Sequence, residues 1–189
     1  MQPLEIIIMN KFIPIRLESD LIEIHPLGER EFREMVRVVN DLYEILGDAE
    51  TMKFIPEKLV KDRQEIELRL IGFVSNYEKE EGFTHFLSHK KYNKIIGGIN
   101  IIPPKKIKIA YNISDEWFIE YYLNKTLWGK GIISGVLNAI VKNMQNQGIN
   151  KISALCHPDN IASIHILNKI GFKDIETMIL GQKYYRLIK

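Results

Sequence analysis

The feature that most constrains this chain is a short glycine loop between an aromatic strand and a helix. Residues 116–123, EWFIEYYL, are dense in aromatic side chains and predict a strand. Gly129, Lys130 and Gly131 follow, and the apolar residues after them recur at the steps of one helical face, which predicts a helix from Ile132. At such a junction, backbone N–H groups point at one place and favour an anion, most often a phosphate.

The remaining pattern predicts one mixed α/β domain built on a single sheet. Before the loop we expect one or two short strands ending at Pro26, helices over 29–46 and 62–77, antiparallel strands over 83–89 and 94–102, and a loop over 103–109. After the helix that begins at Ile132 we expect a strand over 150–157, a short helix capped by Asp159 or Asn160, and a final hairpin turning at Gly181-Gln182. In the short helix, Ile161, Ile164, Leu167 and Ile170 are expected to face inward.

Composition bounds the class of protein. A chain of 189 residues is long enough for one full core without disulfides or metal, and its one cysteine excludes an internal disulfide. The formal net charge of +2 gives no reason to expect a nucleic-acid partner. The N-terminal apolar run is too short for a signal peptide, and no run approaches the roughly 20 apolar residues of a membrane span. We therefore expect a cytoplasmic protein without a membrane partner.

Two phosphate-binding readings of the loop fit poorly. GKGIISG resembles a variant of the dinucleotide fingerprint, but that fingerprint needs a tight turn directly after its strand and several further βα units. Here residues 124–128 intervene, and the chain ends soon afterwards. A nucleotide-binding P-loop requires G-x-x-x-x-G-K-[ST], which the sequence lacks. An NAD(P)-binding oxidoreductase remains a remote alternative.

A resemblance covers nearly the whole chain. The loop LNKTLWGKGI, its helix and the later run HPDNIASIHILNKIGF together resemble the acetyl-CoA site of the GNAT superfamily of N-acetyltransferases, with the closer likeness to the RimJ/RimL branch. SDLIEIHPL and TMKFIP resemble the opening of that branch and its continuation. The resemblance implies an α/β GNAT-like acyl-CoA N-acyltransferase fold, with a central, mostly antiparallel sheet splayed between strands 4 and 5 and flanked by helices. Residues 1–17 would be an extension, 18–123 the acceptor side, and 124–189 the cofactor side with the hairpin.

The same resemblance implies an acetyl-CoA site. The pyrophosphate would lie on the backbone N–H groups of residues 128–133, namely Trp128, Gly129, Lys130, Gly131, Ile132 and Ile133. In the family, the strand before the loop bends at a bulge, and the pantetheine arm pairs with its unpaired backbone, here Tyr121, Tyr122 and Leu123. Asn160 would hydrogen-bond that arm and also cap its helix, and Ser163 would face the sulfur.

Two departures from the family pattern bear on catalysis. Thr126 stands where the signature has Arg or Gln, and Leu167 stands where many members place a tyrosine that protonates the departing thiolate. Ser163 is then the nearest substitute for the acid. Because a thiol is a good leaving group, the acid is also dispensable.

Glu120 is the expected general base. It is the one charged residue in WFIEYYL, and a carboxylate in an apolar strand is costly unless it is paired or functional. Tyr122 projects to the same face by strand alternation and is expected to share the role. His85, His89 and His165 are looser alternatives, and His165 is expected to point to solvent.

A covalent route through Cys156 is disfavoured. Alternation places this cysteine on one face with Ile152 and Ala154, which is typical of a small buried strand residue. No His, Cys and Asp residues show metal-ligand spacing. The sequence therefore predicts direct transfer from acetyl-CoA to an amine acceptor, either a protein N-terminus or a small molecule, by a monomer or homodimer. A non-catalytic acyl-CoA-binding or scaffold protein is the alternative from another class.

Overall fold

A single open sheet organises the chain. The computed structural model describes residues 12–188, and its eight strands follow the order β1-β2-β3-β4-β5-β6-β8-β7. Their bounds are Leu17–Glu18, Ile22–Pro26, Phe83–His89, Lys94–Ile102, Trp117–Leu123, Ile152–Cys156, Phe172–Ile179 and Gln182–Leu187 for β1 to β8. All neighbours are antiparallel except β5 and β6. Because a doubly wound dinucleotide fold needs several parallel neighbours, this sheet does not suit the NAD(P) alternative.

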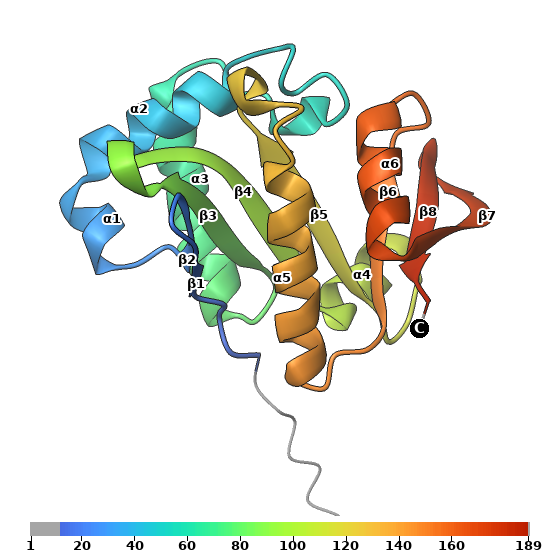
Figure 1. Ribbon diagram of the computed structural model, residues 1–189. Coiled ribbons are helices and arrows are strands. Elements are labelled where there is room, and N and C mark those ends of the chain that lie inside the picture. Colours follow the sequence, from blue (N-terminus) through green and yellow to red (C-terminus); the bar gives the residue numbers. More distant parts are fainter. Residues whose placement is uncertain (1–11, 189) are drawn as a thin grey trace, which may run out of the picture.

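Helices cover both faces of the sheet (Figure 1). They are α1 Glu29–Arg33, α2 Met35–Leu46, α3 Arg63–Glu78, α4 Pro104–Tyr111, α5 Ile132–Asn146 and α6 Ile161–Ile170, with 3₁₀ turns η1 Pro56–Lys58, η2 Lys90–Tyr92 and η3 Lys125–Leu127. Strand alternation divides the core: Ile119 and Leu123 of β5 pack in the cluster of α5, whereas Tyr122 packs in the cluster of α2 and α3. Within residues 12–188, no helix has the length and apolar character needed to cross a bilayer.

The predicted splay is confirmed between β5 and β6, which are the fourth and fifth strands when the two N-terminal strands are counted as one. Only Trp117–Ile152 and Phe118–Ser153 pair across this seam. On its other side, β5 stays paired with β4 in unbroken register from Phe118 to Leu123. The opening therefore comes from the departure of β6. The bulge expected in β5 is not seen in this pairing, and a register shift lies instead between β3 and β4, at Leu87/Ser88.

A buried carboxylate pins the closed end of this seam. Glu116, directly before β5, accepts hydrogen bonds from the hydroxyls of Ser153 on β6 and Tyr184 on β8, and from Arg186 Nη2 at 2.5 Å. Burial alone would raise the pKa of Glu116, but these bonds and the Arg186 charge outweigh it and hold the pKa below its ordinary value. Three strands are thus joined where the splay begins.

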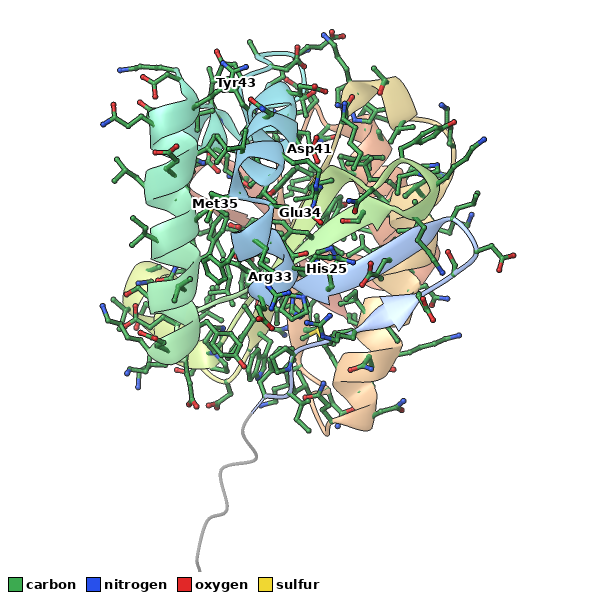
Figure 2. The ribbon with its side chains drawn as sticks, turned by 90° about the vertical axis from the view of Figure 1, so that its left-hand side faces the viewer. His25, Arg33, Glu34, Met35, Asp41 and Tyr43 are labelled. Carbon is green, nitrogen blue, oxygen red and sulfur yellow. The ribbon has the colours of Figure 1, made fainter. Side chains whose placement is uncertain are left out.

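Three expectations about helices were wrong. The helix over 29–46 is interrupted at Glu34, whose φ of −107° and ψ of 31° leave the helical region. Figure 1 shows the resulting short α1 and longer α2, and Figure 2 labels Arg33, Glu34 and Met35 at the interruption. The segment 103–109 is not a loop but the start of α4, because a proline at the first helical position is favourable and Ile107 is buried. Ile161 does not face inward: its side chain is 69% exposed at the first turn of α6.

Candidate active site

The N-terminus of α5 is open to an anion. Gly129 and Gly131 have φ of +74° and +73°, in the left-handed region that favours glycine. Gly131 is the N-cap and offers no side-chain cap. The helical ladder begins with the bond from Gly135 N–H to Gly131 C=O, 3.1 Å long. The N–H groups of residues 132–134 precede that ladder and point out of the helix end, where the positive end of the helix dipole lies.

The segment between β5 and the glycines is a defined turn. Asn124 caps η3 by accepting hydrogen bonds from the Thr126 amide at 3.0 Å and the Thr126 hydroxyl at 2.8 Å. The Trp128 indole N–H donates to the C=O of Leu123 at 2.8 Å. Thr126 therefore stabilises the turn in the position where the family signature carries Arg or Gln. Lys130 and the two glycines beside it are exposed.

The backbone of β5 has unpaired groups where β6 departs. The Asn124 N–H reaches Ile96 C=O on β4, whereas the Trp117 N–H reaches Lys151 C=O on the β6 side. Because backbone groups alternate along a strand, Tyr121 presents its N–H and C=O to the β6 side, beyond the last paired residue. An extended ligand can pair there. The Tyr122 backbone instead faces β4, in register with Gly98, so its predicted role in pantetheine pairing does not fit this geometry.

The first turn of α6 lies across the opening from β5. Asn160 Oδ1 accepts from the Ser163 N–H at 3.1 Å, so the expected cap is present and Asn160 is its residue. Burial raises the pKa of the Tyr121 phenol, and the neighbouring Ser163 hydroxyl partly offsets that rise. The Tyr121 hydroxyl has no hydrogen-bond partner among the described residues. Sequence reasoning used only the backbone of Tyr121 and missed the position of its side chain beside Ser163.

Glu120 lies on the other face of β5, within a polar group. Lys58 Nζ, from η1, donates to Glu120 Oε2 at 2.7 Å. Asn100 Nδ2 on β4 lies 3.4 Å from the same oxygen, and Thr84 Oγ1 on β3 donates to Asn100 Oδ1 at 2.5 Å. The Glu120 side chain is 36% exposed and that of Lys58 is 18% exposed. The carboxylate is thus both paired and reachable from solvent. Lys58 was missed, because it lies 62 positions away in the sequence.

Tyr122 is a poor candidate for the base. Its hydroxyl is buried, and it has no hydrogen-bond partner among the described residues. Burial raises its pKa above the ordinary value of 10.0, so the phenol stays protonated at neutral pH. The ring lies against Gly98, where an added Cβ would come within 2.5 Å of the hydroxyl oxygen. The packing of this face therefore depends on a glycine opposite Tyr122.

The three histidines considered as alternative bases, His85, His89 and His165, are not among the residues that contact Glu120. His85 is buried on β3: Nδ1 donates to Phe83 C=O at 3.0 Å and Nε2 accepts from the Ile15 N–H at 2.9 Å. Burial lowers the pKa of His85 to about 4. His89 packs on Tyr92, with ring centroids 4.6 Å apart. His165 is exposed, as expected.

Cys156 is buried, and burial raises the pKa of its thiol to about 11, so little thiolate exists at neutral pH. This agrees with its interpretation as a packed strand residue. Leu167 is buried as well, at the position where a tyrosine acid would have stood. Within residues 12–188, no group of three or more His, Cys, Asp and Glu is placed to hold a metal ion.

Two hollows among the described residues are lined by neither β5 nor β6. One of about 370 Å³ borders the glycine loop, between Lys130, Gly131 and Ile132 on one side and residues of β1 and β2 on the other. A larger apolar one, of about 500 Å³, lies between Phe32, Met35 and α3. Neither hollow is lined by Glu120, Lys58 or Asn160, and the smaller one borders the open N-terminus of α5.

The splayed strands, the glycine turn and the open helix end lie within a segment that matches a known family. A model of the acetyltransferase (GNAT) domain matches residues 31–173. The chain belongs to the GNAT acetyltransferase family. The family resemblance read from the sequence is therefore confirmed. Comparison with curated protein sequences finds no match.

Solved structures share the GNAT fold at low sequence identity. The ribosomal-protein-S5-alanine acetyltransferase of Vibrio fischeri is 17% identical, covers 91% of this chain and 94% of its own, and has a TM-score of 0.67. RimL, the ribosomal L7/L12 α-N-protein acetyltransferase solved with coenzyme A, is 16% identical over 90% of this chain and 95% of its own, with a TM-score of 0.67. MccE, the microcin C7 self-immunity acetyltransferase solved with acetyl-CoA and AMP, is 19% identical over 90% and 94%, with a TM-score of 0.66. The first two are acetyltransferases of ribosomal proteins, and at this identity the likeness of all three shows the fold.

Proposed function

We propose that this GNAT domain is an N-acetyltransferase that moves the acetyl group of acetyl-CoA directly to a primary amine in a ternary complex. The observation that carries the proposal is the uncapped helix end at Gly131, next to a strand whose backbone is unpaired where β6 departs. The helix end favours an anion, and the unpaired backbone of β5 favours an extended chain. Coenzyme A offers both in one molecule, as its pyrophosphate and its pantetheine arm. RimL and MccE, which share the fold, were solved with coenzyme A and with acetyl-CoA.

Each end of the cofactor would have its own partners in this chain. The pyrophosphate would accept hydrogen bonds from the N–H groups at Trp128–Ile133, with Lys130 adding positive charge at the rim. The arm would pair with the backbone at Tyr121 and Leu123 and with the Asn160 amide. The gap-facing N–H of Tyr121 would also polarise the thioester carbonyl as charge develops on its oxygen.

The acceptor amine must lose a proton before it attacks, and we assign that proton to Glu120. Its carboxylate is partly exposed and already holds an ammonium group at 2.7 Å. The thiolate would then take a proton from Ser163 or from solvent. Because the Cys156 thiol is buried with a raised pKa, a covalent acetyl-cysteine intermediate is disfavoured and direct transfer is the simpler route.

The acceptor belongs to one of two classes, a protein N-terminus or a small-molecule amine. RimL and the Vibrio fischeri neighbour are acetyltransferases of ribosomal proteins, and MccE is a self-immunity enzyme. We further propose that the protein acts in the cytoplasm, as a monomer or homodimer, without a nucleic-acid or membrane partner.

A thermal-melt titration with acetyl-CoA tests the cofactor, with NADH and NADPH as controls. At a hundredfold excess over Kd a ligand of the native state adds about 2.7 kcal/mol, which is a rise of roughly 5–10 °C for a domain of this size. A rise with acetyl-CoA alone, followed by release of free CoA when amines are added, is the expected result. No rise with acetyl-CoA contradicts the proposal.

A non-catalytic acyl-CoA-binding protein is the second candidate, and one observation favours it. The Lys58–Glu120 ion pair occupies the carboxylate that an incoming amine would need. That protein would show the melt shift without CoA release for any amine. If Glu120→Gln released CoA at the wild-type rate, the protein would be an enzyme whose general base is a residue other than Glu120.

A further inference from the structure

Lys58 holds a primary amine at the proposed base. Its Nζ lies 2.7 Å from Glu120 Oε2, within hydrogen-bond distance. That is the position an acceptor amine must occupy to pass its proton to Glu120. The Asn100 amide approaches the same oxygen at 3.4 Å and is oriented by Thr84. The chain therefore fills its own acceptor position with a nucleophile of the same chemical class as the proposed substrate.

The lysine is held in place through its backbone. Arg69 Nη2, from α3, donates to the C=O groups of Glu57 at 3.2 Å and Leu59 at 3.3 Å, one on each side of Lys58. The Lys58 N–H donates to Ile55 C=O at 2.9 Å, which closes the η1 turn. These hydrogen bonds on both sides fix the backbone from which the Lys58 side chain extends to Glu120.

The loop that carries Lys58 also reaches the other side of the opening. Phe54, ahead of η1, packs on His157 at the end of β6, with ring centroids 5.2 Å apart. In Figure 1 this loop, which links α2 to α3, runs over the top of the sheet toward α6. Lys58 is thus presented from a segment that bridges the acceptor side to the strand lining the proposed pantetheine gap.

We propose that Lys58 is an internal acetyl acceptor, modified by the enzyme's own acetyl-CoA. The inference rests on the proposed transferase function. The Lys58 ammonium gives one proton to Glu120, and its nitrogen lone pair then attacks the thioester carbonyl carbon. A C–N bond forms and the C–S bond breaks, with its electron pair leaving on sulfur. The nitrogen loses a second proton and the sulfur takes one up, so the products are acetyl-lysine, CoA thiol and one released proton.

Acetylation of Lys58 would change the site. The amide carries no charge, so the ion pair with Glu120 is lost and the carboxylate is available to an incoming amine. Self-acetylation would therefore convert a site occupied by the chain into one open to substrate. A lag before steady CoA release with an external amine, removed by prior incubation with acetyl-CoA, follows from this order of events.

Two other lysines serve as internal controls. Lys125 pairs with Asp48 at 2.8 Å and Glu50 at 2.9 Å, and Lys94 pairs with Glu44 at 2.5 Å. Their side chains are 40% and 39% exposed, against 18% for Lys58. Unassisted chemical acetylation by a thioester favours exposed amines, so it would modify Lys94 before Lys58, whereas the two carboxylates that raise the pKa of Lys125 to about 12 slow its reaction. Selective modification of the least exposed of the three identifies an enzymatic reaction.

The test is incubation of the full chain with acetyl-CoA followed by intact mass and tryptic peptide mapping. Acetylation blocks cleavage after Lys58 and joins residues 54–58 to 59–61 in one peptide. We expect one acetyl group at Lys58, formed at a rate independent of protein concentration. Glu120→Gln should lower that rate at least about 100-fold, Lys58→Arg should abolish it, and Lys125→Arg should leave it unchanged. Heat-denatured protein should lose the selectivity.

The outcomes separate this inference from the function on which it rests. Acetyl groups at Lys125 and Lys94 to the same extent as Lys58, or equal rates in wild type and Glu120→Gln, overturn the inference. So does acetyl-CoA binding with rapid acetylation of external amines while Lys58 stays unmodified, and in that case the transferase function stands. Absence of any melt shift with acetyl-CoA and of CoA release with every amine removes both.

Discussion

The two ends of the β5–β6 seam are marked by two glutamates with opposite surroundings. At the closed end, Glu116 is buried and is bound by Ser153, Tyr184 and Arg186 from two neighbouring strands. At the open end, Glu120 is partly exposed and is held by Lys58, with the Asn100 amide nearby. A buried carboxylate with several donors ties strands together, whereas an exposed one with a single cation can exchange its partner. The same residue type thus joins strands at one end and, in the proposed mechanism, accepts the proton of the amine at the other.

Truncation of the two glutamates should have very different effects on stability. Glu116→Ala leaves the buried hydroxyls of Ser153 and Tyr184 without their acceptor and should lower the free energy of unfolding by about 2–3 kcal/mol. Glu120→Ala removes a partly exposed pair and should lower it by about 1 kcal/mol or less. Urea denaturation followed by circular dichroism measures both. Similar losses for the two variants would show that the ends of the seam do not differ in this way.

Catalysis should show the reverse order. Glu120→Gln keeps the size and polarity of the side chain but cannot accept the proton, so the rate of amine acetylation should fall by about 100-fold or more. The melt shift with acetyl-CoA should be unchanged, since the change lies on the acceptor face of β5. Glu57→Gln, on the same loop as Lys58, is the matched control and should keep the wild-type rate. An equal fall in both variants would point to a general loss of charge rather than to a base.

Acid should weaken the closed end of the β5–β6 seam through Glu116. The pKa of Glu116 in the folded state lies below its ordinary value of 4.5, so its contribution to stability is present above pH 4.5 and is lost as the pH falls through the folded-state pKa. The loss should be smaller than that of Glu116→Ala, because a protonated carboxyl keeps part of its hydrogen bonding. Unfolding free energies measured from pH 6 to pH 3 should fall more steeply in wild type than in Glu116→Gln. Parallel curves would contradict this.

The smallest effect is expected at Asn160, and two substitutions divide its roles. Asn160→Ala removes the cap of α6 and should cost about 1 kcal/mol. Asn160→Asp keeps an oxygen for the Ser163 N–H but loses the amide N–H₂ group, so it should hold stability while weakening acetyl-CoA binding. Melting temperatures with and without acetyl-CoA separate the two. If Asn160→Asp bound acetyl-CoA with wild-type affinity, Asn160 would have no role beyond capping α6.

Local patterns predicted most of the fold. The glycines at 129 and 131, the apolar face of α5 and the alternation in β5 each depend on neighbours in sequence, and each gave the correct element. The interruption at Glu34 and the helix at Pro104 were missed for a physical reason. Both depend on which side chains find a buried place in the finished structure: Val36 is exposed, although it continues the apolar pattern, and Ile107 is buried within a lysine-rich segment.

The candidate site was predictable only along one strand and one loop at a time. The resemblance supplied the residues of the glycine loop and Asn160, and the charge of Glu120 was visible by itself. Contacts between distant segments were not visible. Lys58 meets Glu120, and Tyr121 lies beside Ser163, only because the α2–α3 loop and α6 come to the same end of the sheet. Periodic patterns describe neighbours within one helix or strand, so they do not predict contacts between such distant segments.

The two hydrogen bonds of His85 make the position of Ile15, just ahead of β1, sensitive to protonation of the ring. Donation from Nδ1 to Phe83 and acceptance at Nε2 from Ile15 fit only the neutral ring with its hydrogen on Nδ1. A second proton, on Nε2, would place one N–H group against the N–H of Ile15. His85 therefore cannot become charged while this hydrogen bond is kept. Burial lowers the pKa of His85 to about 4, with smaller contributions from the charges of His25 and Arg16, so we expect the contact with Ile15 to break only near that pH. Hydrogen exchange at the Ile15 amide, relative to its intrinsic rate, should therefore accelerate as the pH approaches 4, ahead of amides in the middle of β4.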